Sequence, residues 1–267
     1  MADQSAVVFN APTSGPCRPL TANAQDKSLP NTRLFMKNKV YESMDDAVAD
    51  IPDGVTIFSP GFGGVGVPRN LLAALNRQGA KGLTAVSNNA GTVDELVDIG
   101  TLVEAGQIKK MICAFTATPH PSQVTPFTRM YNNDEIDAEL VPQGTLAERL
   151  RTAAAGIGGF YTPTSVGTEL AEGKEHREIN GRMHVLEHPL PGDYGLIRAW
   201  KADTLGNLVF RLTQRNFNPL MAMAATITIV EVENDIVEPG ELDPDAIHVP
   251  GIYVDRLVRI PEDGIWD

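Results

Sequence analysis

Four glycines fall within six consecutive positions of the segment 53–72, which reads DGVTIFSPGFGGVGVPRNLL. A mainly apolar run, 55–58, precedes the glycines, and Pro68, a residue suited to the first turn of a helix, follows them. Closely spaced glycines let backbone N–H groups face a single point, and a helix N-terminus behind them adds a partial positive charge. The segment therefore predicts a strand, a tight loop and a helix start that together bind an anion or an oxyanion.

The glycine spacing Gly61-x-Gly63-x-x-Gly66 also fits the dinucleotide-binding fingerprint. That fingerprint requires an acidic residue about twenty positions further on, at the end of the second strand, to bind a ribose. Here the second expected strand ends in amide side chains, Asn88 and Asn89, so a nicotinamide cofactor is disfavoured. A purely structural glycine turn stays open as an alternative, because glycine also serves tight turns.

Three amide side chains, Asn88, Asn89 and Gln143, follow expected strands. Two adjacent amides after one strand favour a ligand contact by at least one of them, although either can also cap the next helix. Gln143 lies between the expected strand 136–141 and a helix. Its neutral amide suits a carboxylate or thioester oxygen without adding charge, and its alternative role is to satisfy loop backbone.

A nucleophile with its base cannot be assembled from this sequence. His120, His184 and His188 lie in loop or strand contexts without a nucleophile pattern beside them. Cys113 lies inside an apolar run and is expected in the core. No metal-ligand spacing is present either, so the sequence predicts no metal site.

Strands, loops and helices alternate along the chain from Lys39 onwards. In the first half we expect strands at 55–58, 83–86, 109–115 and 136–141, and helices at 43–50, 69–78 and 145–154. In the second half we expect shorter strands at 183–186, 194–200 and 208–212, a helix at 220–225, and strands at 226–232 and 252–258. This alternation predicts an α/β fold, with a mainly parallel sheet, helices on both faces and added shorter strands in the C-terminal half. Ligands of such sheets lie outside the carboxyl ends of the strands, where the polar loops collect.

The composition of the 267-residue chain is that of an ordinary globular protein, with 42% hydrophobic and 21% charged residues. The net charge is −12 and no basic stripe offsets it, which argues against nucleic acid or an anionic membrane surface as a partner. No apolar run is long enough to predict a membrane span. Two cysteines far apart, Cys17 and Cys113, make no disulfide framework and favour a cytoplasmic location.

The first 36 residues differ in composition from the rest, because they are polar and rich in proline. They also lack the cationic start and apolar run of a secretory signal. We expect a disordered extension over 1–36 and a single domain over 37–267.

Several segments together resemble the α subunit of family I CoA-transferases, the 3-oxoacid CoA-transferase group. In chain order they are DGVTIFSPGFGGVGVP, SNNAG, VPQGTLAERLR, GGFYTPTSVGT, LAEGKE, DTLGNL and RNFNPL. They cover nearly all of residues 39–258 in the family's order and spacing, so the resemblance is specific. It implies an α/β sheet related to the sugar-phosphate isomerase group.

The resemblance also implies the chemistry and the partner. A glutamate that belongs to the β subunit is the nucleophile, and it attacks an acyl-CoA thioester. The CoA thiolate then attacks the mixed anhydride at the glutamyl carbonyl, which frees the donor carboxylate and gives an enzyme thioester, and an acceptor carboxylate then takes the CoA. No residue of this chain is then the nucleophile. The expected donor is succinyl-CoA and the expected acceptor a 3-oxo acid, as in fatty or aromatic acid catabolism. The assembly would be an α2β2 heterotetramer, with CoA as a substrate and no tightly bound cofactor.

By the same resemblance, the glycine loop binds the CoA and thioester end of the substrate, and Asn88 and Gln143 stabilise oxyanion charge near the reacting carbonyl and carboxylate. The loop residues are Pro60, Gly61, Phe62, Gly63, Gly64, Val65 and Gly66. The family usually carries glycine where this chain has Pro60, and proline offers no N–H for a backbone contact.

Two other functions stay open from the sequence. A sugar-phosphate isomerase of the related fold needs its own acid/base pair beside the phosphate loop, and none is located. A non-catalytic acyl-CoA or sugar-phosphate sensor usually carries a DNA-binding module, and this acidic chain has no basic helix-turn-helix. The sequence does not determine which two acids exchange CoA.

Overall fold

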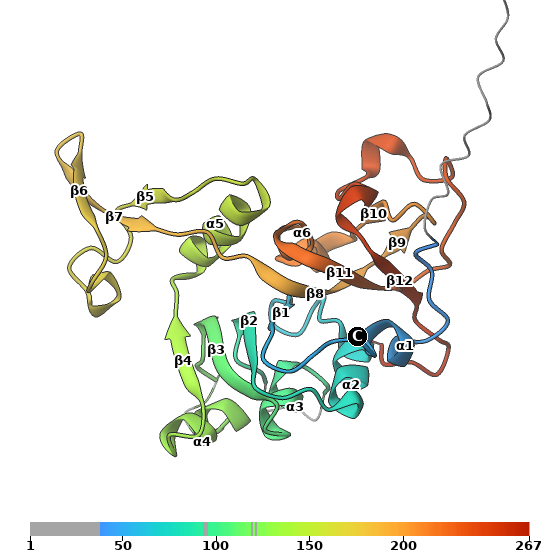
Figure 1. Cartoon of the computed structure of the whole chain (residues 1–267), viewed down its shortest axis with the longest axis horizontal. Coiled ribbons are helices and arrows are strands. Elements are labelled where there is room, and N and C mark those ends of the chain that lie inside the picture. Colours follow the sequence, from blue (N-terminus) through green and yellow to red (C-terminus); the bar gives the residue numbers. More distant parts are fainter. Residues whose placement is uncertain (1–37, 93–95, 119, 121, 267) are drawn as a thin grey trace, which may run out of the picture. The chain divides into compact units, whose positions relative to one another are not determined.

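A seven-stranded parallel sheet organises the chain in the computed structural model, which describes residues 38–92, 96–118, 120 and 122–266. The strand order is β12-β11-β8-β1-β2-β3-β4 (Figure 1). The strands are β1 (Thr56–Ser59), β2 (Leu83–Asn89), β3 (Ile108–Phe115), β4 (Asp137–Leu140), β8 (Gly192–Ala199), β11 (Ala225–Val232) and β12 (Arg256–Arg259). Every pairing in the sheet is parallel, so all carboxyl ends lie at one edge, which we call the carboxyl edge.

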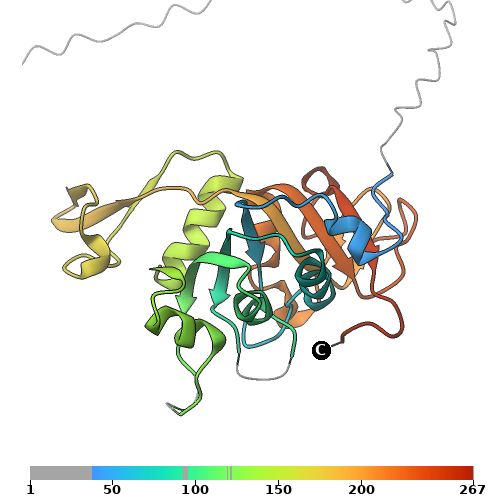
Figure 2. The ribbon, with the colours of Figure 1, turned by 60° about the horizontal axis from the view of Figure 1, so that its bottom comes forward.

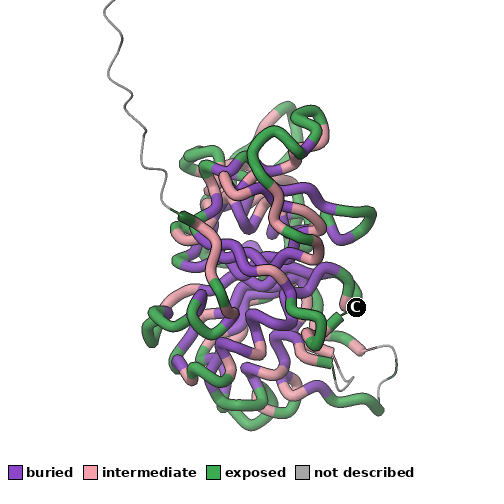
Figure 3. The backbone as a smooth tube through the Cα atoms, turned by 90° about the vertical axis from the view of Figure 1, so that its right-hand side faces the viewer, coloured by how far each residue is buried: buried purple, intermediate pink, exposed green. Residues whose placement is uncertain are grey.

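Helices cover both faces of this sheet (Figures 1 and 2). One face carries α1 (Met44–Val48), α2 (Arg69–Gln78), α3 (Ile99–Glu104) and α4 (Pro126–Asn132), and the other carries α5 (Gln143–Ala154) and α6 (Asn218–Ala224). Successive residues of a strand point to opposite faces, so Ile57 packs into the first core and Phe58 into the second. Figure 3 shows the buried residues running through the sheet, with exposed residues in the outer loops.

The added strands form two small antiparallel sheets. One contains β5 (Phe160–Thr162), β7 (Arg182–Glu187) and β6 (His176–Ile179), and the other contains β9 (Lys201–Ala202) and β10 (Leu208–Val209). Among the described residues, four short 3-10 helices complete the elements: Glu169–Ala171, Leu212–Arg215, Pro244–Ala246 and Gly251–Tyr253. The expected α/β fold, with helices on both faces of a parallel sheet and added strands, is confirmed.

Most elements lie where the sequence predicts them, and α2 has the expected bounds. Ser43 caps α1 as expected, because its hydroxyl accepts a hydrogen bond from the amide of Asp46 at 3.1 Å. The expected strand 208–212 is wrong beyond Val209, since a 3-10 helix begins at Leu212. The expected strand 252–258 begins only at Arg256, since a 3-10 helix precedes it.

The edge strand β12 is covered by the first described residues of the chain. The amide of Tyr41 donates to the carbonyl of Leu257 at 2.8 Å, and the amide of Leu257 donates to the carbonyl of Lys39 at 2.7 Å. The expected extension over 1–36 lies outside the described residues, so its disorder stays a prediction. None of the described helices is long and apolar enough to cross a membrane.

Candidate active site

The glycine loop joins β1 to α2 at the carboxyl edge and contains a two-residue hairpin. The amide of Phe62 donates to the carbonyl of Val65 at 3.1 Å, and the amide of Val65 donates back to Phe62 at 3.2 Å. Between them, Gly63 and Gly64 have φ values of 59° and 91°. Positive φ at both central positions is the conformation that strongly favours glycine in such turns. The predicted tight loop is therefore present.

The start of α2 differs from the sequence expectation. The amides of Asn70 and Leu71 both donate to Oε2 of Glu231 at 2.9 Å. Glu231 lies in β11 and is fully buried. The expectation that this helix N-terminus faces the anion site is wrong, because a carboxylate of the chain itself already caps the helix.

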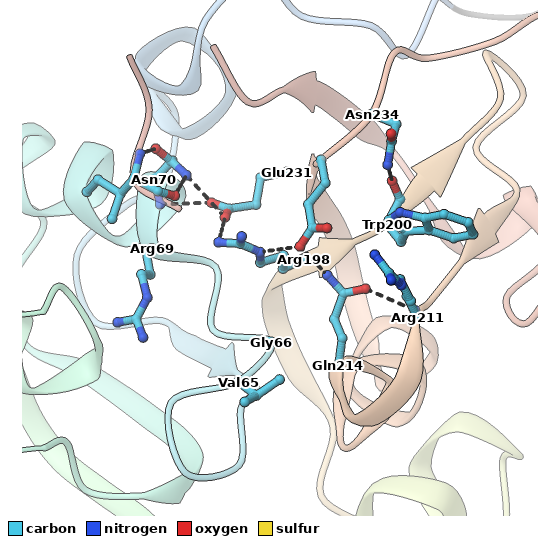
Figure 4. A network of polar contacts seen from close by, with 12 residues as sticks. Val65, Gly66, Arg69, Asn70, Arg198, Trp200, Arg211, Gln214, Glu231 and Asn234 are labelled. Atoms are coloured by element: carbon cyan, nitrogen blue, oxygen red, sulfur yellow. Dashed lines mark hydrogen bonds and ion pairs between the residues drawn. The ribbon is translucent and has the colours of Figure 1, made fainter. Parts of the chain in front are cut away.

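Glu231 belongs to a buried polar network that connects α2 with β8 and β11 (Figure 4). Arg198, 1% exposed, pairs with Glu231 at 3.3 Å and with Glu233 at 2.9 Å. Gln214 donates to the same Glu233 oxygen at 2.7 Å. Burial raises the pKa of the Glu231 carboxyl to about 7, against the Arg198 charge and the N–H donors of Asn70 and Leu71, which favour ionisation. The network fixes the elements on which the glycine loop rests.

Two asparagines hold the C-terminal half of the loop in place. Asn216 Nδ2 donates to the carbonyl of Val65 at 3.0 Å, and Asn218 Nδ2 donates to the carbonyl of Gly66 at 3.0 Å. Gly66 itself has φ 75°, and a Cβ there would lie 2.9 Å from both Asn216 Nδ2 and the carbonyl of Gln214. Glycine is therefore required for this close approach. These asparagines belong to the segment RNFNPL, to which sequence reasoning gave no role.

Asn88 and Gln143 meet at the same edge of the sheet. Asn88 is the last residue but one of β2 and is 3% exposed, and Gln143 opens α5. Gln143 Nε2 donates to Asn88 Oδ1 at 2.7 Å. Within the described residues, no acceptor is found for Asn88 Nδ2, which stays available as a donor. Asn89 pairs through its backbone position with Phe115 of β3, and its side chain has no hydrogen bond among the described residues.

Apolar side chains surround the loop on its exposed side. Phe62 is 52% exposed and Val65 39% exposed. Leu212, in the 3-10 helix next to the asparagines, is 82% exposed and has a φ of 50°. Pro60, by contrast, is buried and supplies no N–H at the loop's entrance. The loop thus offers an apolar rim with polar backbone behind it.

The remaining candidates have structural roles. Cys113 is a buried free thiol whose pKa burial raises to about 11, so its assignment to the core is confirmed. Glu148 pairs with Arg151 at 2.8 Å on the exposed side of α5. In the part of the chain that the structure describes, no group of His, Cys, Asp and Glu could hold a metal ion.

Comparison with known proteins identifies the family. Residues 41–259 match the family model described as coenzyme A transferase, and the chain belongs to this family. The resemblance to the 3-oxoacid CoA-transferase group is confirmed, and the isomerase and sensor alternatives find no support among the matches.

Two relatives illustrate the likeness in sequence. A protein of Bacillus subtilis, named as one subunit of a probable succinyl-CoA:3-ketoacid coenzyme A transferase, is 52% identical over 220 residues, which cover 82% of this chain and 89% of that protein. The 3-oxoadipate CoA-transferase of Pseudomonas putida has one subunit that is 49% identical over 225 residues, covering 84% of this chain and 95% of that protein.

A solved structure illustrates the likeness in fold. Glutaconate coenzyme A-transferase from Acidaminococcus fermentans superposes with a TM-score of 0.70 at 23% identity, covering 84% of this chain and 76% of that chain. At that identity the likeness establishes the shared fold alone.

Proposed function

We propose that this chain is the α subunit of a heteromeric CoA-transferase that moves CoA between succinyl-CoA and a 3-oxo acid, and that it is active only with a β subunit. The observation that carries the proposal is the composition of the carboxyl edge. It gathers the glycine loop and the Asn88–Gln143 pair, while the sequence shows no pattern of a nucleophile with its base. The nucleophilic glutamate then comes from the partner, whose existence is supported by relatives that are each named as one subunit of a transferase.

Within this reaction the chain supplies positioning and charge stabilisation. Asn88 Nδ2 donates to the substrate oxygen on which negative charge develops, and Gln143 holds the Asn88 side chain in that orientation. A well-placed donor of this kind contributes about 3–4 kcal/mol to transition-state stabilisation. The glycine loop, Pro60–Gly66, lets the thioester approach the backbone closely, with the apolar stem of CoA against Phe62 and Val65.

The assembly and location are part of the same proposal. The exposed apolar rim of the loop supports burial against a second subunit, in an α2β2 heterotetramer. Coenzyme A enters as a thioester substrate, and no cofactor is held tightly. The two-cysteine composition and the buried free thiol of Cys113 support a reducing, cytoplasmic location.

Reconstitution tests the proposal. The chain is purified alone, and transfer of CoA from succinyl-CoA to a panel of 3-oxo and simple carboxylic acids is followed with and without the β subunit. We expect turnover only in the mixture, and after incubation with acyl-CoA we expect a CoA-sized mass increase on the β subunit. Turnover by the isolated chain, shown by mass spectrometry to be free of partner, would contradict the proposal. A mass increase on this chain instead of its partner would contradict it equally.

A further inference from the structure

Two consecutive peptide units of the glycine loop have their carbonyls turned towards α6. The carbonyl of Val65 accepts from Asn216 Nδ2 and the carbonyl of Gly66 accepts from Asn218 Nδ2, each at 3.0 Å. Figure 4 shows Val65 and Gly66 in one view with the network of Arg198 and Glu231. No described peptide bond is cis. In a planar trans peptide the C=O and N–H groups point in opposite directions. The N–H groups of Gly66 and Val67 therefore face away from the two asparagines.

These two N–H groups have no acceptor among the described residues. Gly66 and Val67 are both buried. Within the hairpin, the amides of Phe62 and Val65 are satisfied by each other's carbonyls. Buried backbone N–H groups are nearly always paired, so two adjacent N–H groups without an acceptor among the described residues are suited to bind an acceptor supplied by a ligand.

The two asparagines are fixed, so the direction of these amides is fixed as well. Each side-chain nitrogen also donates to a second carbonyl at 2.9 Å, that of Thr213 for Asn216 and that of Gln214 for Asn218. Two carbonyl acceptors, which cannot donate, determine which end of each side-chain amide is nitrogen. Asn218 is fully buried, and its Oδ1 accepts from the amide of Arg198 in β8 at 2.9 Å.

We propose that the amides of Gly66 and Val67 bind the acyl oxygen of the substrate, as thioester carbonyl or as carboxylate, and that Asn216 and Asn218 are the positioning residues that aim them. The inference rests on the proposed CoA-transferase function. Two adjacent N–H donors can bind one developing oxyanion, and donors fixed beforehand need no rearrangement during the reaction. The asparagines act through the loop and do not touch the substrate.

Kinetics of the reconstituted enzyme with its β subunit provide the first test. Asn216→Asp and Asn218→Asp each keep the side-chain shape and replace the donor by an acceptor that repels the loop carbonyl. We expect kcat to fall about ten- to a hundredfold for each, with the KM for acyl-CoA changing much less, because the donors strengthen in the transition state. Asn234→Asp is the matched control, since Asn234 Nδ2 donates to the carbonyl of Trp200 at 2.7 Å, outside the loop. Unchanged kcat in both loop variants would overturn the proposal.

Infrared spectroscopy separates positioning from a loss of folding. Acyl-CoA labelled with 13C at the carbonyl is bound to complexes in which the nucleophilic glutamate of the partner is replaced by alanine, so that no turnover occurs. We expect the thioester carbonyl band to move to lower frequency in the otherwise wild-type complex, and this shift to shrink with Asn216→Ala, whose side chain is only half-buried. An equal shift in both complexes would overturn the proposal for the thioester oxygen.

Binding of the acceptor carboxylate to the two amides is tested in the same way. A labelled acceptor acid is bound, and its carboxylate bands are followed. A response of the acid alone assigns the amides to the carboxylate, and a response of neither ligand rejects the site. Failure of the proposed function is distinguishable, because the wild-type mixture would then show no transfer at all.

Discussion

Gln143 and Asn88, 55 positions apart in the chain, are joined by a 2.7 Å hydrogen bond from Gln143 Nε2 to Asn88 Oδ1. The bond occupies the oxygen of Asn88 and leaves its nitrogen as the free donor. The first residue of α5 thereby controls the orientation of the Asn88 side chain near the carboxyl end of β2.

Removing the Asn88 side chain should lower activity more than removing the Gln143 side chain. We expect Asn88→Ala to reduce kcat/KM by about 10²–10³-fold, the usual effect of losing an oxyanion donor. Gln143→Ala should cost less, about tenfold, because it removes only the orientation of that donor. Asn89→Ala is the control, and its kcat/KM should stay near wild type. A larger loss for Asn89→Ala than for Asn88→Ala would show that Asn89, and not Asn88, is the donor.

Gly64→Asp should abolish acyl-CoA turnover while leaving the sheet folded. Gly64 has φ 91°, and a Cβ there would lie 3.5 Å from the Arg69 guanidinium nitrogen that donates to the Gly64 carbonyl. A side chain at position 64 strains the turn, because φ is positive there, and its carboxylate repels an anionic ligand. Gly64→Ala, which adds bulk without charge, should impair kcat/KM less. If the Asp variant melted like wild type by circular dichroism and kcat/KM barely moved, the loop would have a structural role only.

The pH dependence of stability should reveal the buried carboxyl of Glu231. Its pKa in the folded chain is about 7, against 4.5 for the free side chain, so the folded state binds the proton more tightly. The contribution of Glu231 to the free energy of unfolding is therefore full below about pH 4.5 and falls as the pH rises to about 7, by about 3 kcal/mol.

Urea unfolding of wild type and Glu231→Gln at pH 5 and pH 8 measures this effect. The stability of wild type relative to the variant should be greater at pH 5, because glutamine does not titrate. Glu148→Gln, at an exposed ion pair of α5, is the control and should cost under about 1 kcal/mol. A wild-type advantage that grows with pH would mean that Arg198 and the α2 amides, which favour the ionised form, outweigh the effect of burial.

Removing residues up to Phe35 should leave assembly and activity largely intact. The segment has no periodic apolar face with which to dock on the body. Thermal melts and transfer assays of the shortened and full chains, each mixed with the β subunit, provide the comparison. A large fall in melting temperature of the shortened chain would show that the extension packs on the body or on the partner.

The sheet could be predicted because its elements carry strong local signals. Helix α2 ends at Gly79, whose φ of 86° forms the left-handed cap that glycine favours, and the sequence shows this break directly. Helices α3 and α4, of 6 and 7 residues, are not predicted by the sequence pattern. Each depends on a side-chain cap, Asp98 or Thr125, and on packing rather than on a long apolar period.

The candidate site could be predicted only where it follows strands. The glycine loop, Asn88 and Gln143 stand at strand ends, where polar residues are conspicuous. The roles of Asn216 and Glu231 escape sequence reasoning because their partners lie far away in the sequence, 151 positions for the Val65 carbonyl and 161 for the Asn70 amide. No local spacing reveals a contact of that separation, and a buried glutamate within a β-branched strand reads as an ordinary strand residue.

The pairing of Lys39 and Tyr41 with Leu257 sets a limit on how far the chain can be shortened. Both backbone groups of Leu257 are occupied by this short segment. A chain that began at Glu42 would present a bare strand edge, and bare edges recruit strands from other molecules. Such a chain would be expected to self-associate through β12 and to precipitate on concentration. A practical expression boundary therefore lies before Lys39.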